Sequence, residues 1–263
     1  MKKTGFNMVR KHIKIEEERW YFHCDRLGLI VWQDMVNGGG PLHSWYVTYL
    51  ATALSVLRIR QNDRNYRLFA REDKEGRDEF VREMLETIRL LKNHPSICYW
   101  TIFNEAWGQF DSDNVYDWFR GLDDTRFIDS TSGWFRQKKS DVDSRHVYFR
   151  KVKLQGDGIK PLVLSEFGGK TWKAEGHVFN PDKSYGYGGC KSREELNDAL
   201  VKLYMEEVLP CIHNGLCGAV YTQISDVEDE INGLLTYDRK VEKIDPEKML
   251  PVAAAMQQAI REK

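Results

Sequence analysis

Short apolar runs alternate with longer amphipathic patterns along most of the chain. The runs are rich in branched and aromatic residues, which predicts buried strands. They occupy seven stretches: 6–10, 29–34, 97–103, 126–130, 141–148, 161–164 and 218–223. Apolar residues at helical spacing predict helices at 15–27, 45–59, 79–92, 113–120, 193–214 and 246–261. This alternation predicts one α/β domain over residues 1–263, of the (β/α)8 TIM barrel class.

Two of the predicted strands lead into a glutamate. The run 97–103 leads into Asn104-Glu105, and the run 161–164 leads into Ser165-Glu166 and a pair of glycines. A single Glu in such a place could cap a helix or pair with an Arg, because a buried carboxylate is otherwise costly. Two strand ends that each carry Glu on one sheet instead suit the carboxylate pair of a glycoside hydrolase.

The order of these motifs, with Asn104-Glu105 first and Ser165 to Gly169 later, resembles glycoside hydrolase family 2. That family holds β-galactosidases, β-glucuronidases and β-mannosidases, and the resemblance covers nearly the whole chain. It implies that Glu105 is the acid/base and Glu166 the nucleophile. The implied reaction is retaining hydrolysis of a β-glycoside through a covalent glycosyl-enzyme, with a β-galactoside as the family default.

The resemblance also implies a set of substrate-binding residues. Arg10 matches an arginine that lies against the nucleophile, and Asn104 would donate to the 2-hydroxyl of the sugar. Tyr148, in the pattern His146-x-Tyr148, would donate a hydrogen bond to Glu166; otherwise it is an ordinary surface tyrosine. The remaining candidates at strand ends are His12, Asp34, Trp107, His146 and Gln223. An Asn-x-Lys element, which would mark a glucuronidase, is not evident after Glu166.

The strand count suggests that the barrel is incomplete. From Phe6 onward the predicted strands correspond to strands two to eight of such a barrel, and 1–4 resembles the end of the helix before them. We therefore expect a barrel without its first strand and without the β-sandwich domains that precede it in the family. A gap between strands 6–10 and 218–223 would expose two edges, favour self-association and weaken activity.

Composition and charge narrow the class of partner. The net charge is −1 and the basic residues form no block, which argues against nucleic acid and anionic membrane surfaces. No apolar run approaches the length of a membrane span, and no signal peptide opens the chain, so the compartment is left open. Aromatic residues make up 12% of the chain, which fits a carbohydrate substrate but also an ordinary core.

The five cysteines show neither a Cys-x-x-Cys pair nor zinc-ligand spacing. Cys24 shares a face with Trp20 and Leu27 in the predicted helix 15–27, and Cys98 lies in a predicted strand. Both cysteines are therefore expected to be small buried hydrophobic residues.

Two other functions compete with the glycosidase. A metal-dependent barrel hydrolase would use the possible ligands His12, Asp34, His146 and Glu166. The chain has no His-x-His or other close ligand pair, so we expect no metal and no cofactor. The alternative that is not an enzyme is a barrel fragment that folds without activity.

Overall fold

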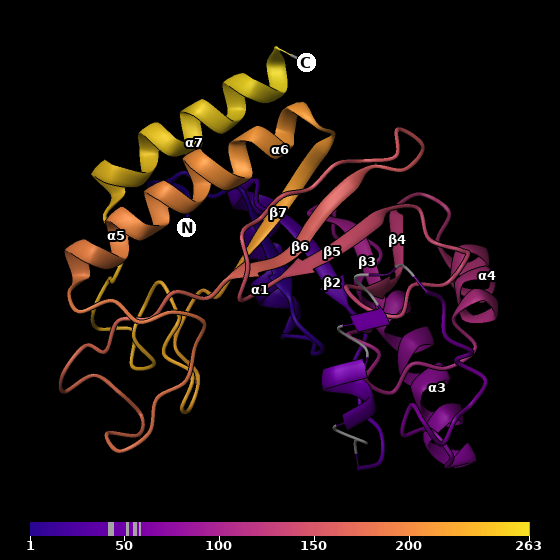
Figure 1. Ribbon diagram of the computed structural model, residues 1–263. Helices are drawn as coiled ribbons and strands as arrows, with labels where there is room; N and C mark the ends of the chain where they lie inside the picture. The colour runs from indigo at the N-terminus through magenta and orange to yellow at the C-terminus, as the bar shows by residue number, and fades with distance from the viewer. Residues whose placement is uncertain (42–44, 51–52, 55–56, 58, 263) are drawn as a thin grey trace. The chain divides into compact units, whose positions relative to one another are not determined.

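The computed structural model describes residues 1–41, 45–50, 53–54, 57 and 59–262 (Figure 1). The chain forms two compact units, one of Asn7–Arg145 and the other of Met1–Phe6 with His146–Lys263. The single domain over 1–263 stays a prediction. Within the described residues, every helix is too short or too polar to cross a membrane.

The unit Asn7–Arg145 is built on a parallel sheet of order β1-β2-β3-β4. Its strands are β1 (Met8–Lys11), β2 (Ile30–Asp34), β3 (Ile97–Asn104) and β4 (Phe127–Ser132). The four strands expected in this part of the sequence are thereby confirmed. Parallel strands place their carboxyl ends at one edge of a sheet, so Asp34 and Asn104 end on the same side.

The helices of this unit are α1 (Glu18–Leu27), the π-helical segment η2 (Trp45–Leu50), α3 (Lys74–Leu91) and α4 (Ser112–Leu122). Helix α3 begins earlier than predicted because the Asp73 side chain accepts the backbone N–H groups of Glu75 and Gly76. Its predicted core stripe is buried: Phe80, Met84, Ile88 and Leu91. Of the predicted insertion 45–59, residues 51–52, 55–56 and 58 lie outside the described residues.

The buried face of α1 differs from the prediction. Tyr21 and Cys24 are buried, whereas Leu27 is 56% exposed. The helix starts at Glu18, and of the expected stripe Trp20, Cys24 and Leu27 only Cys24 is fully buried. Gly28 closes the helix in the left-handed conformation, as expected from its position.

Cys98 is exposed, so the expectation that it is buried is wrong. Val31 pairs with Ile97 while Trp32 pairs with Tyr99, which leaves Cys98 as an extra residue in β3. Such a bulge locally disrupts the pairing and turns the extra side chain away from the regular alternation. Cys24 is buried as expected, and all five cysteines are free thiols.

The second unit holds a sheet of order β5-β6-β7. Its strands are β5 (Asp143–Val147), within which the change of unit falls, β6 (Leu162–Gly168) and β7 (Leu216–Thr222). Strands β6 and β7 are parallel. The described residues therefore contain the seven strands that the sequence predicts.

The helices of this unit are η1 (Lys2–Thr4), α5 (Arg193–Lys202), the π-helical η3 (Leu203–Val208), α6 (Leu209–His213) and α7 (Pro246–Arg261). The predicted helix 193–214 is thus continuous but widened at its centre. Pro210 explains the widening, since a proline has no N–H and clashes with the carbonyl four residues before it. Helix α7 lies along α5 and α6 (Figure 1), and a core that includes Phe167, Leu200 and Val252 joins sheet and helices.

Candidate active site

The predicted site residues divide between the two units. The unit Asn7–Arg145 carries Arg10, His12, Asp34, Asn104, Glu105 and Trp107. The other unit carries His146, Tyr148, Glu166 and Gln223.

A hydrogen-bonded chain joins the ends of β1, β2 and β3. Arg10 donates from Nε and Nη2 to the two oxygens of Asp34, each over 2.9 Å, and from Nη2 to Asn104 Oδ1 over 2.8 Å. Burial alone would raise the pKa of Asp34, but Arg10 and then His12 outweigh it and lower that pKa to about 2. Because Asn104 Oδ1 accepts from Arg10, the Asn104 amide keeps Nδ2 as its donor.

Glu105 follows β3 on a sharp turn. Its φ is 50° and that of Ala106 is 63°, so two successive non-glycine residues adopt the left-handed conformation. The Glu105 N–H donates to the Ser132 carbonyl at the end of β4 over 3.0 Å, which fixes the turn. Strain of this kind costs on the order of 1–3 kcal/mol per residue and is concentrated at functional positions.

His12 and Trp107 lie at the margins of this group. His12 Nδ1 is 3.3 Å from Asp34 Oδ2, and the His12 side chain is half exposed. Trp107 is 43% exposed, and its carbonyl accepts a hydrogen bond from the Asn37 amide over 2.6 Å. An exposed indole beside the turn at Glu105 is available to stack on a ligand, and this role remains a prediction.

Glu166 lies on a bulge in β6. Leu164 pairs with Ala219 and Phe167 with Tyr221, so Ser165 and Glu166 together oppose one residue of β7. A bulge re-aims a side chain, and here it leaves Ser165 buried and Glu166 partly exposed. Glu166 Oε2 accepts from the Tyr148 hydroxyl over 2.8 Å, the contact that the family resemblance implied, and His146 Nδ1 is 3.5 Å away.

Two further residues hold Tyr148, and the sequence did not assign them this role. Its hydroxyl is 2.8 Å from Thr222 Oγ1 at the end of β7, and its ring stacks on Tyr187 with centroids 4.1 Å apart. The only feature of the sequence that could have pointed to Thr222 is its place directly before the strand-end candidate Gln223. Tyr187 was visible only as an aromatic residue in a glycine-rich loop.

The glycines after Glu166 make room for two tyrosine rings. A Cβ on Gly168 would lie 2.4 Å from the Tyr221 ring, and one on Gly169 would lie 2.2 Å from the Tyr187 ring. Both glycines also have positive φ, of 91° and 71°. The turn after the predicted nucleophile is therefore tied directly to the packing of Tyr187.

The Gln223 side chain is hydrogen-bonded within the loop that follows β7. Its Nε2 donates to Asn232 Oδ1 over 3.0 Å, and its carbonyl accepts from the Leu234 N–H over 3.0 Å. Asn232 is fully buried and also donates to Glu230. The substrate-binding role of Gln223 stays a prediction.

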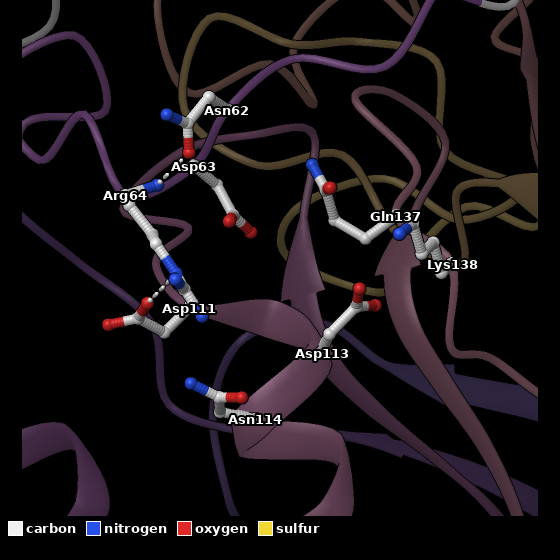
Figure 2. Close-up of a pocket in the computed structure, with 8 residues that line it drawn as sticks. All are labelled: Asn62, Asp63, Arg64, Asp111, Asp113, Asn114, Gln137 and Lys138. Atoms are coloured by element: carbon white, nitrogen blue, oxygen red, sulfur yellow. Dashed lines mark hydrogen bonds and ion pairs between the residues drawn. The ribbon is translucent and has the colours of Figure 1, made fainter.

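A polar pocket of about 370 Å³ lies at the start of α4, apart from the predicted residues. Its lining residues are Asn62, Asp63, Arg64, Asp111, Asp113, Asn114, Gln137 and Lys138. Figure 2 shows the side chains of Asp63, Asp113 and Gln137 directed into this space. Asp63 accepts from Ser112 and Gln109, and Arg64 donates to Asp111, so much of this polarity secures the beginning of α4.

Curated relatives resemble this chain over part of its length. β-Mannosidase B of Thermothelomyces thermophilus is 26% identical over 151 residues, which are 57% of this chain and 13% of that protein. β-Mannosidase B of Aspergillus clavatus is 24% identical over 185 residues, 70% of this chain and 16% of that one. The chain thus matches less than a fifth of the length of these relatives.

Among solved structures, the β-D-glucuronidase of Dictyoglomus thermophilum matches with a TM-score of 0.62 at 18% identity. The match covers 100% of this chain and 46% of the glucuronidase chain. At this identity the likeness concerns the fold. The sequence profile described as "Glycosyl hydrolases family 2, TIM barrel domain" matches residues 1–243. Because that match takes in nearly all of the 263 residues, the chain belongs to glycosyl hydrolase family 2, in its TIM barrel domain.

Proposed function

We propose that the protein is a retaining β-glycosidase in which Glu166 is the nucleophile and Glu105 the general acid and base. The observation that carries the proposal is Glu166 on the β6 bulge, with Oε2 2.8 Å from the Tyr148 hydroxyl. A carboxylate that accepts such a hydrogen bond is held in one orientation for attack on an anomeric carbon. Membership of family 2 supplies the class of reaction.

The proposed reaction has two displacements at the anomeric carbon. First, an oxygen of Glu166 bonds to that carbon while the bond to the leaving oxygen breaks, and Glu105 gives its proton to the leaving oxygen. Then water attacks the same carbon, Glu105 takes the proton of the water, and the bond to Glu166 breaks. Two inversions retain the β configuration.

The surrounding residues have separate parts in this proposal. Tyr148 orients Glu166, and Thr222 orients Tyr148. Asp34 holds Arg10, and Arg10 orients Asn104 so that Nδ2 can donate to the 2-hydroxyl of the sugar. We also propose that Arg10 provides positive charge for Glu166, and that substrate contacts come from His12, Trp107, His146 and Gln223.

The substrate we propose is a neutral β-hexoside, with β-galactoside as the family default. The proposal is supported by the absence of an Asn-x-Lys element after Glu166 in the sequence. The relatives named above are two β-mannosidases and a β-glucuronidase, so a panel of aryl β-galactoside, β-mannoside, β-glucuronide and β-galacturonide tests the proposal directly. The highest kcat/KM on a uronide would reject the neutral sugar and leave the two carboxylate roles intact.

Two substitutions test the carboxylates. Glu105→Ala should lower kcat/KM for an alkyl β-glycoside by about 10²–10⁴-fold and should affect bond cleavage in a dinitrophenyl glycoside much less, because a good leaving group departs without a proton. Glu166→Ala should abolish turnover of both substrates. Glu206→Ala, which removes an exposed carboxylate on η3, is the matched control.

Two outcomes would reject the proposal. Equal damage to both substrates by Glu105→Ala would remove its role as acid. If NMR of the first product formed from a β-glycoside shows the α anomer, the mechanism is inverting and Glu166 is no nucleophile.

A further inference from the structure

We propose that Phe149, Tyr185 and Tyr187 form a subsite for a second sugar ring, the one that departs with the leaving oxygen. The proposal rests on the glycosidase function above and adds a substrate class to it, a disaccharide or longer β-glycoside. All three residues belong to the same unit as Glu166.

The aromatic surface is continuous with the predicted nucleophile. Tyr148 donates to Glu166, and its ring stacks on Tyr187 at 4.1 Å with an interplanar angle of 19°. Phe149 and Tyr185 meet Tyr187 edge to face, with centroids 4.9 Å and 5.4 Å away. A ring seated on this surface would therefore adjoin a sugar that is bonded to Glu166.

Packing alone does not account for Phe149. Its side chain is 80% exposed, and its φ of 57° is a conformation that a bulky residue rarely adopts. Tyr185 is also 51% exposed. Isolated exposed aromatic residues are common, but these lie together beside the tyrosine that bonds Glu166, and Phe149 itself has a strained φ. Both features indicate a binding surface.

Backbone hydrogen bonds fix the segment that presents the two tyrosines. The Tyr185 N–H donates to the Asp229 carbonyl over 2.7 Å, and the Ile231 N–H donates to the Tyr185 carbonyl over 3.0 Å. The Tyr187 N–H donates to the Gly169 carbonyl over 2.9 Å. The rings of Tyr185 and Tyr187 meet edge to face, so this segment presents them together. A surface fixed before binding loses little entropy when a ligand arrives.

The chemistry of the surface favours a sugar over a purely apolar group. A pyranose has an apolar face of C–H bonds and a rim of hydroxyls, which suits aromatic rings with polar groups around them. Polar groups do flank these rings. Lys170 Nζ would be 3.0 Å from a Cβ on Gly188, next to Tyr187. Asp229, whose side chain accepts a hydrogen bond from the Asn180 amide, directly precedes Glu230, the bridge partner of Tyr185.

The test compares a methyl β-glycoside with the β-linked disaccharide of the same sugar, chosen from the panel above, in the intact protein. Phe149→Ala and Tyr185→Ala should each raise KM for the disaccharide about tenfold. Their effect on the methyl glycoside should be several times smaller. Phe149→Tyr should restore the disaccharide KM, and Phe22→Ala, at an exposed phenylalanine of α1, is the matched control.

Direct binding separates this subsite from turnover and from folding. Calorimetry with Glu166→Gln should show the disaccharide binding about tenfold more tightly than the methyl glycoside, and Phe149→Ala should remove the difference. Phe149→Asn suits the positive φ and should fold at least as well, yet lose the same preference.

The outcomes distinguish the two proposals. If neither glycoside is hydrolysed by the intact protein, the glycosidase function itself fails. If both are hydrolysed and the variants change both KM values equally or not at all, the subsite is rejected. A selective loss on aryl glycosides, with the disaccharide unaffected, would also overturn it, because the occupant would then be an apolar ring.

Discussion

Asp34 is a buried carboxylate that the fold keeps ionised. It is 1% exposed, so desolvation opposes its charge, and the bidentate contact with Arg10 offsets that cost. Removing one partner of such a pair leaves the other charge buried and uncompensated. At the scale of single residues, Asp34 therefore fixes the Arg10 side chain that donates to Asn104.

Asp34 should make the protein sensitive to acid. Its pKa is lowered from 3.8 to about 2, so its contribution is complete above about pH 4 and is lost as the pH falls through 2. The contribution amounts to about 2 kcal/mol. Urea unfolding followed by tryptophan fluorescence should show the wild type losing this amount between pH 4 and pH 2.

The comparison is with Asp34→Asn. This variant should be less stable than the wild type at pH 7, because Arg10 loses its anionic partner, and its curve should be flatter below pH 4. Between pH 7 and pH 5 the two curves should run parallel. An identical decline of both proteins below pH 4 would assign the acid sensitivity to other groups.

At the scale of elements, two bulges decide which side chains leave the regular alternation of their strands. One in β3 exposes Cys98, and one in β6 turns Glu166 out beside a buried Ser165. Neither bulge has a sequence signature of its own. The first made a prediction wrong, and the second places the residue proposed as nucleophile.

Gly169→Ala tests the link between the end of β6 and the aromatic loop. A Cβ there would lie 2.2 Å from the Tyr187 ring, so the ring must move and its stacking on Tyr148 must weaken. Because Tyr148 orients Glu166, we expect kcat/KM to fall at least tenfold. The measurement is steady-state hydrolysis of the aryl glycoside preferred in the panel.

Gly176→Ala is a matched control for this variant. Gly176 shares a positive φ, of 78°, but has open space where a Cβ would be. Both substitutions strain the backbone, and only Gly169→Ala displaces a ring. Comparable activity in the two variants would mean that Tyr187 has no influence on Glu166.

The sequence predicted the elements well and the contacts between them less well. Apolar runs located the seven strands that the described residues contain, and strand ends singled out Glu105 and Glu166 as catalytic candidates. Thr222 and Tyr187 could not be assigned, since their contacts with Tyr148 join segments far apart in the chain. The π-helical turn at η3 was not predicted either, because the apolar residues of this helix have ordinary α-helical spacing and only Pro210 disturbs it.

At the scale of the whole molecule, the two ends of the chain meet in one unit. Residues Met1–Phe6 belong with His146–Lys263, and η1 packs against α7. Phe6 also meets Tyr204 edge to face at 6.3 Å, and Lys3 pairs with Glu242. The first six residues are therefore packed into this unit, although the sheet that follows them belongs to the other unit.

Gly5 is the point at which this attachment can be broken by one substitution. Its φ is 86°, and a Cβ would lie 2.3 Å from Cβ of Ala253 on α7, a short side chain with no freedom to move aside. Gly5→Ala should therefore cost on the order of 1–3 kcal/mol, from backbone strain and from separation of η1 and α7. Hydrogen exchange should show faster exchange at the Gly5 amide, which donates to the Lys2 carbonyl, and along the middle of α7.

Gly158→Ala separates the clash from the strain. Gly158 has a φ of 73° and open space around it, so its variant carries the strain alone. We expect that variant to leave exchange in α7 at the wild-type rate and to lower the free energy of unfolding less than Gly5→Ala does. If the two variants are equally stable and α7 stays protected in both, residues 1–6 lie on this unit without holding it together.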